Sequence, residues 1–348
     1  MNDWSRTTAL SLLCCACLAG LACAAAAAQT LTIYSNRSPE RIGPILRAYS
    51  VQTGIQIRVV YIKNGLLDRL AKDGAANVGD VVLASDYGLL VDAKARGLTA
   101  AVNSPEIAKN VPSQYRDSDG HWIGVTRRAR ALFVSKTRVQ QTKLRYEDLS
   151  RPEWKRKICM RPGGHSYNVS LIASLIAHNG VEKTEAWLSG LRANLARRPE
   201  GDDRAQMKGV YDGQCDVAIV NTYDMGETTT NMASSNQRAW ARSIRIVFPN
   251  AEGRGSHVSV SGIARLKTSK NVEAATSFIA YFTSPLGQKI SAAINYEYPL
   301  HDGVPSSDLV ESWGKLIADK LPLSKVARYR EKARQLVRRL MFDEVASR

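Results

Sequence analysis

The stretch "CDVAIVNTYDMG" (Cys215–Gly226) joins an apolar run to a polar end. The run has the length and composition of a buried strand, and it ends in Asn-Thr-Tyr-Asp. A second stretch, "CMRPGGHSYN" (159–168), repeats its spacing, because in both a cysteine precedes a tyrosine by eight positions. The two cysteines are therefore 56 positions apart, and so are Tyr167 and Tyr223. This match predicts that the two tyrosines share one site.

Around these stretches, short β-rich runs alternate with helical patterns. "LTIYS" precedes the helical "PERIGPILRAYSVQTG", and "IQIRVVY" precedes "GLLDRLAKDG". A second series begins at "RALFVSK" and includes "KICM". This alternation predicts an α/β fold with parallel sheets. About 320 residues beyond the leader exceed one comfortable core, so we expect two lobes. No linker is apparent, which predicts that the chain crosses between the lobes along strands, near 126–134 and 256–266.

Tyr167 and Tyr223 each follow the end of a predicted strand and open a predicted helix. In open α/β sheets, ligands bind in the crevice outside these carboxyl ends of the strands. Asp86 and Tyr87 follow the third strand in the same way, in "LASDYG". For those two residues we favour the simpler roles of helix capping and packing over a role in ligand binding.

The first 28 residues are typical of a cleaved secretory signal peptide. A long uncharged run, "TALSLLCCACLAGLACAAAAA", ends in Ala-x-Ala before Gln29. Retention as a membrane anchor and a lipid on Cys23 are the alternatives. Removal of residues 1–28 leaves Cys159 and Cys215, and in an exported protein we expect them to form a disulfide rather than two free thiols. The loop so closed, about 57 residues long, corresponds to roughly 4 kcal/mol in the chain-entropy estimate.

The formal net charge of +16 indicates an anionic ligand, an anionic surface or nucleic acid. The densest segment, "KVARYREKARQLVRRL", has the pattern of an amphipathic helix with a solvated basic face. No aromatic-interleaved basic motif is present, so we predict no nucleic-acid partner. The sequence also lacks the Gly-x-Ser-x-Gly, Walker and His-Glu-x-x-His motifs, so we predict no enzymatic activity.

Two phenols beside a carboxylate indicate a hard metal ion. Tyr167, Tyr223 and Asp224 offer oxygen ligands, and the high charge of Fe(III) suits it to displace a phenolic proton. Calcium prefers an Asp/Asn/Gly-rich loop, and zinc prefers paired His and Cys residues. Basic residues after the first strand and at the predicted crossing are suited to hold an anion beside the metal; they are Arg37, Arg128 and Arg130. We interpret His165 as a loop hydrogen-bonding residue rather than a metal ligand.

Together, several segments resemble the iron(III)-binding periplasmic proteins of bacterial ABC importers. They include "GDVVLASDYGLL", "RPGGHSYNVSLIAS", "GDDRAQMKGVYDGQCDVAIVNTYDMG" and "NYEYPL". The family's two tyrosines fall on Tyr167 and Tyr223, and its Arg-Ala-Arg stretch falls on Arg128–Arg130. Two positions depart from the family. Asp224 stands where the family usually has a second tyrosine, and Arg37-Ser38-Pro39 stands where many members have His or His-Tyr.

The resemblance implies a two-lobed periplasmic binding protein of type 2, each lobe a mainly parallel sheet flanked by helices, with the ligand cleft between the lobes. It implies a monomer that captures ferric iron and delivers it to an inner-membrane ABC permease. Either Asp224 replaces the family's second tyrosine as a ligand, or an anion such as carbonate or citrate completes the coordination. The alternative is a binding protein for an organic anion or a ferric chelate, with bare-iron ligation weakened by Asp224 and by the missing His or Tyr. A basic envelope protein that binds an anionic polymer is a further alternative. The expected divisions are a signal peptide (1–28), lobe 1 (29–126 and 258–302), lobe 2 (127–257) and C-terminal helices mostly on lobe 2 (303–348).

Overall fold

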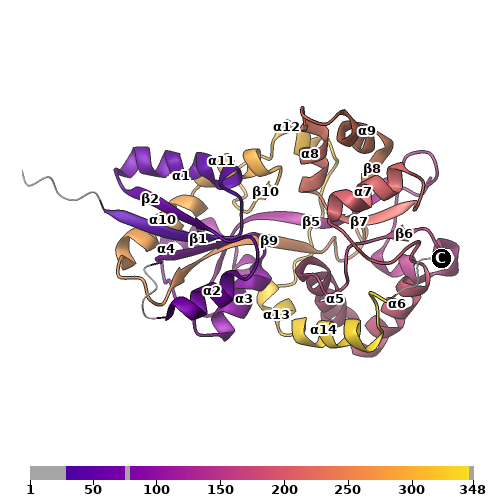
Figure 1. Cartoon of the computed structure of the whole chain (residues 1–348), viewed down its shortest axis with the longest axis horizontal. Helices are drawn as coiled ribbons and strands as arrows, with labels where there is room; N and C mark the ends of the chain where they lie inside the picture. Colours follow the sequence, from indigo (N-terminus) through magenta and orange to yellow (C-terminus); the bar gives the residue numbers. More distant parts are fainter. Residues whose placement is uncertain (1–28, 75–78, 345–348) are drawn as a thin grey trace, which may run out of the picture.

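The computed structural model describes residues 29–74 and 79–344, so the predicted signal peptide lies outside the described residues. Two groups of helices and strands lie side by side along the long axis (Figure 1). The first group contains β1 (Thr30–Ser35), α1 (Pro39–Thr53), β2 (Gln56–Tyr61), α2 (Leu66–Asp73), β3 (Val81–Ala84), α3 (Tyr87–Ala95), β4 (Thr99–Ala100), α4 (Pro105–Asn110), α10 (Val272–Thr283), α11 (Pro285–Asn295) and β10 (Tyr298–Pro299). The second contains β6 (Ile158–Cys159), α5 (Ser166–Asn179), α6 (Val181–Ala193), α7 (Asp203–Tyr211), β7 (Val217–Asn221), α8 (Tyr223–Thr230), α9 (Ser235–Ser243) and β8 (Ile244–Val247).

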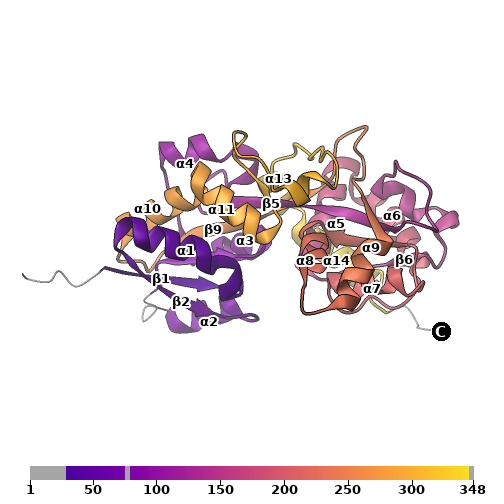
Figure 2. The same ribbon diagram turned by 90° about the horizontal axis from the view of Figure 1, so that it is seen from above.

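Two long strands, β5 (Ile123–Ser135) and β9 (Val258–Leu266), join the groups. From above, β5 runs from one group into the other (Figure 2). Its first half pairs with β9, and its second half, from Arg130, pairs with β7 and β8. We call the two groups lobe 1 and lobe 2. The exact boundaries at 126, 257 and 302 stay predictions.

The fold class is confirmed as a mixed α/β fold of two lobes. The strand order is β2-β1-β3-β9-β5-β7-β6. The expected parallel pairing holds for β1 with β2 and β3, and for β6 with β7. The expectation of mainly parallel sheets is wrong at the centre, where β5 and β9 are antiparallel to their neighbours. These strands carry the chain between the lobes in opposite directions, so they pair with each other in opposite directions.

The core of lobe 1 shows why these segments form a layered sheet. All four residues of β3 are buried, which fits a strand covered by helices on both faces. Helix α1 buries Ile42, Ile45, Leu46 and Tyr49, which lie on one face at helical spacing. Gly54 ends this helix at φ 74°, a left-handed conformation that glycine adopts without steric cost.

The C-terminal segment continues through α12 (Asp308–Glu311), α13 (Leu323–Ala327) and α14 (Arg330–Arg339). Helix α14 is amphipathic, as its sequence predicts, and it packs on α5 with Ala333, Leu336 and Val337 buried. Its Arg330 is buried too, over the ring of Tyr87. Within 29–74 and 79–344, no helix has both the length and the apolar content needed to span a membrane.

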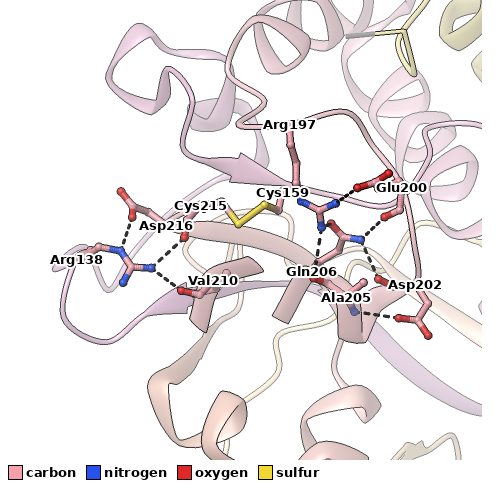
Figure 3. Close-up of a disulfide and its surroundings, with 10 residues drawn as sticks. All are labelled: Arg138, Cys159, Arg197, Glu200, Asp202, Ala205, Gln206, Val210, Cys215 and Asp216. Carbon is pink, nitrogen blue, oxygen red and sulfur yellow. Dashed lines mark hydrogen bonds and ion pairs between the residues drawn. A yellow bond between two sulfur atoms is a disulfide. The ribbon is translucent and has the colours of Figure 1, made fainter. Parts of the chain in front are cut away.

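The predicted disulfide is confirmed: Cys159 and Cys215 are bonded, with their Cα atoms 5.8 Å apart (Figure 3). Beside it, Arg138 donates to the carbonyl oxygens of Val210 and Cys215, at 2.6 and 3.0 Å. On the other side, Gln206 donates to the carbonyl oxygens of Glu200 and Asp202 (Figure 3). The disulfide thus lies between the hydrogen bonds near the C-terminal end of α7 and those near its N-terminal end. This helix contributes Asp203 to the site described below.

Candidate metal site

Tyr167 and Tyr223 come together at the edge of lobe 2 that faces lobe 1. Tyr167 is the second residue of α5 and Tyr223 is the first residue of α8, and their hydroxyl oxygens lie 3.3 Å apart. Strands β6 and β7 run parallel, so the two segments that follow them, which carry the tyrosines, leave the sheet at the same edge. His165 precedes α5, and its Nδ1 accepts the amide of Tyr167 at 3.3 Å. The loop hydrogen-bonding role predicted for His165 is therefore confirmed.

Cations surround the ring of Tyr167. The guanidinium carbons of Arg128, Arg130 and Arg161 lie 5.3, 5.9 and 5.0 Å from its centre. Three positive charges therefore lie close to this aromatic ring. Burial raises the pKa of Tyr223 well above 10, and the nearby Tyr167 and Asp224 raise it further. Without a cation, Tyr223 is therefore a neutral phenol at neutral pH.

Asp224 is a buried carboxyl with an unused oxygen. Its Oδ2 has no hydrogen-bond partner, and the same holds for Oδ1 of Asp203. Burial raises the pKa of Asp224 well above its usual value, and the negative charges of Asp203 and Glu227 add to this effect. A buried carboxylate without a donor is costly, and a bound cation removes that cost. The residues therefore fit a metal ion.

Two of the three predicted anion-binding arginines, Arg128 and Arg130, lie near the ring of Tyr167, and each of the three has a carboxylate partner. Arg37 donates to Glu297 at 2.7 Å. Arg128 donates to Asp86 at 3.0 Å, and Arg130 donates to Asp203 at 2.5 Å. The three side chains are at most 8% exposed. Their charges are thus largely neutralised inside the protein, and anion binding by them stays a prediction.

Sequence reasoning missed the acids that organise these arginines. Asp203, at the start of α7, also accepts the amide of Asn221 at 3.0 Å and so fixes the end of β7. Glu297 accepts hydrogen bonds from Arg37, Thr126 and Ser261. Burial acts to raise the pKa of Glu297, but the charges of Arg37 and Arg128 outweigh it and lower that pKa. No local signal marks these acids, since their partners are distant in the sequence.

Asp86 and Tyr87 have the structural roles that we favoured. Asp86 caps α3 by accepting the amide of Gly88 at 2.9 Å, and its other oxygen accepts from Arg128 and Ser259. Tyr87 is buried, and its hydroxyl lies 2.9 Å from that of Ser170 in lobe 2.

The donor set determines which metal ions suit this site. Among the described residues, no three His, Cys, Asp or Glu side chains are grouped to hold a metal ion. A metal here would therefore depend on the phenols. Ligand oxygens about 2.1 Å from a small cation, at right angles, lie about 3 Å apart, which matches the two tyrosines. Phenolate and carboxylate oxygens select a small, hard, highly charged ion.

Comparison with known proteins gives a consistent result. Residues 76–317 match the model of the family described as bacterial extracellular solute-binding protein. Iron uptake protein A1 of Synechocystis sp. is 37% identical over 300 residues, which cover 86% of this chain and 83% of that protein. Ferric iron-binding protein A of Mannheimia haemolytica, solved in an open conformation, is 38% identical with a TM-score of 0.87, over 91% of this chain and all of that one. The Trichodesmium protein IdiA (FutA), solved with iron and citrate ligands, is 33% identical with a TM-score of 0.85, over 89% of this chain and 99% of that one.

Proposed function

Because this chain belongs to the family of bacterial extracellular solute-binding proteins, we propose that it captures ferric iron in the cleft and delivers it to an inner-membrane ABC permease. The observation that carries the proposal is the pair of phenol oxygens 3.3 Å apart, together with the buried Oδ2 of Asp224, which has no hydrogen-bond partner and follows Tyr223 in α8. The names of the relatives support it, since those proteins are described as binding or taking up iron. The protein would act as a periplasmic monomer once residues 1–28 have been removed.

In this proposal Tyr167, Tyr223 and Asp224 bind the ion. Burial raises the pKa of Tyr223, so this phenol gives up its proton only when the metal binds. Three protein oxygens leave positions for an accompanying anion such as carbonate or citrate. Closure of the lobes would then enclose the ion and form the surface that the permease recognises.

The test is a visible spectrum of the metal-stripped mature protein during titration with ferric citrate. We expect a tyrosinate-to-iron charge-transfer band that saturates at one equivalent. Tyr223→Phe should remove or shift the band, whereas Tyr211→Phe, at an exposed position on α7, should leave it unchanged. If the wild-type protein gives no band and iron does not raise its melting temperature, the proposal is wrong.

A ferric chelate is the second candidate cargo. The arginines predicted to hold a small anion are paired with carboxylates, and the Trichodesmium relative was solved with both iron and citrate. Loading with labelled ferric citrate followed by gel filtration separates the two cases. If citrate elutes with the protein in equal amount to iron, the cargo is the chelate. If only iron elutes, it is the ion.

A further inference from the structure

One face of α8 carries both a predicted iron ligand and the contacts of this helix with lobe 1. Tyr223, Gly226, Glu227 and Thr230 are spaced i, i+3, i+4 and i+7, so they lie on the same side of the helix. The helix therefore links the metal site to the surface where the two lobes meet.

The first contact is an ion pair between the two lobes. Arg41, on α1 of lobe 1, pairs with Glu227, and its guanidinium carbon lies 5.9 Å from the centre of the Tyr223 ring. Glu227 is 11% exposed and Arg41 is 32% exposed, so solvent screens the pair only partly. Arg204 of lobe 2 lies farther from Glu227, at 3.9 Å.

The second contact is made by Tyr296, which follows α11 of lobe 1 in a left-handed conformation (φ 52°). Its hydroxyl lies 2.8 Å from Oγ1 of Thr230. Its ring lies against the backbone of α8 at Gly226, where an added Cβ would be 2.3 Å from Cγ of Tyr296. That distance is far below van der Waals contact, so this approach requires glycine at position 226.

We propose that Arg41, Glu227, Gly226 and Tyr296 form an inter-lobe clasp that positions Tyr223 and slows the release of bound iron. The role in release rests on the proposed function, whereas the role in holding the lobes together does not. Arg41 of lobe 1 lies over the ring of Tyr223 while it pairs with Glu227, so closure of the lobes fixes the position of this predicted ligand. Iron binding and lobe closure thus favour each other through α8, because the ligand interacts differently with the open and closed forms.

The first arm of the test needs no iron. Small-angle X-ray scattering of the metal-free protein should show a larger radius of gyration for Gly226→Ala and for Arg41→Gln/Glu227→Gln than for the wild type. Gly253→Ala is the matched control, because its Cβ would meet nothing closer than 3.8 Å. An unchanged radius in both clasp variants would overturn the clasp, whatever the protein binds.

The second arm measures the rate at which a chelator removes iron from the loaded protein. We expect Arg41→Gln and Glu227→Gln each to accelerate release by roughly fivefold or more, a factor typical of coupling between two sites. The double variant should be no faster than either single one, and Arg41→Lys should keep part of the effect. Glu252→Gln, which breaks the exposed pair with Lys143, should change nothing. Unchanged release rates in the Arg41 and Glu227 variants would contradict the link to iron, whereas a wild-type protein that never gains the charge-transfer band would contradict the proposed function instead.

Discussion

Asp224 lowers the stability of the folded protein when no metal is bound. Its carboxyl is buried, Oδ2 lacks a donor, and Asp203 and Glu227 oppose its ionisation. A raised pKa means that the unfolded chain ionises more readily than the folded one. The resulting destabilisation is therefore absent below the ordinary pKa of an aspartate and grows as pH rises toward the folded value. Such a cost is typical of a site selected for binding rather than for stability.

We therefore predict opposite effects of Asp224→Asn on stability and on iron binding. The metal-free variant should gain about 1–2 kcal/mol in free energy of unfolding at pH 7, because the amide carries no charge to bury. Urea unfolding measures this gain. Iron retention against a chelator should fall if Asp224 is a ligand. A variant that loses stability would show that Asp224 makes a favourable contact in the unliganded protein.

The two tyrosines could be predicted from the sequence because their spacing repeats that of the cysteines. Arg41 and Glu297 could not be predicted in this way. Arg41 lies in an ordinary amphipathic helix, and only the packing of α1 near α8 gives it a role. The carboxylates that pair with Arg37, Arg128 and Arg130 were also hidden, since at least 42 positions separate each pair. Long-range ion pairs leave no periodic signal in a sequence.

At the scale of elements, β6, β7 and α7 form one unit held by the disulfide. Cys159 and Cys215 are both buried, and Gly209 of α7 lies against their sulfur atoms. The unit carries Asp203 and is followed by the helices of both tyrosines. A loosened disulfide should therefore affect the stability of lobe 2 and the spacing of the phenols together.

We predict that Cys159→Ala/Cys215→Ala lowers the free energy of unfolding by about 2–4 kcal/mol, because the loop between the cysteines then gains entropy in the unfolded chain. Urea unfolding under non-reducing conditions gives the difference. Reductant should lower the wild-type stability and leave the alanine variant unchanged, which serves as the control. Equal stabilities of variant and wild type would mean that the bond has no role in folding.

The sequence predicts where several strands and helices lie, but not the direction in which the central strands pair. The strands β1, β3 and β7 and the helix α1 follow from apolar runs and helical periodicity. The directions of β5 and β9 did not follow, since composition does not fix the direction in which a strand pairs. Their directions depend on the passage of the chain between the lobes, which is a property of the whole topology.

At the scale of the molecule, a series of buried hydrogen bonds joins the two lobes. Tyr87 of lobe 1 bonds to Ser170 of lobe 2, and Ser170 lies 3.0 Å from Nε2 of His257. His257 precedes β9, and its amide donates to the hydroxyl of Tyr146 at 3.1 Å. Burial lowers the pKa of His257 to about 4, so it is neutral in the folded protein at neutral pH.

This histidine should make the molecule sensitive to mild acid. Its folded pKa lies below the ordinary value of about 6.5, so the unfolded chain takes up the proton first as pH falls. The destabilisation is thus absent above that value and grows until pH reaches about 4. At pH 5 it amounts to roughly 2 kcal/mol from this residue. His257→Gln keeps a group that can bond to Ser170 and should reduce the loss of stability between pH 7 and pH 5 by that amount. Urea unfolding at both pH values measures the loss, with His301→Gln as the control at a partly exposed site. If the loss is the same in His257→Gln and wild type, the acid sensitivity arises elsewhere in the molecule and the buried link between the lobes does not titrate.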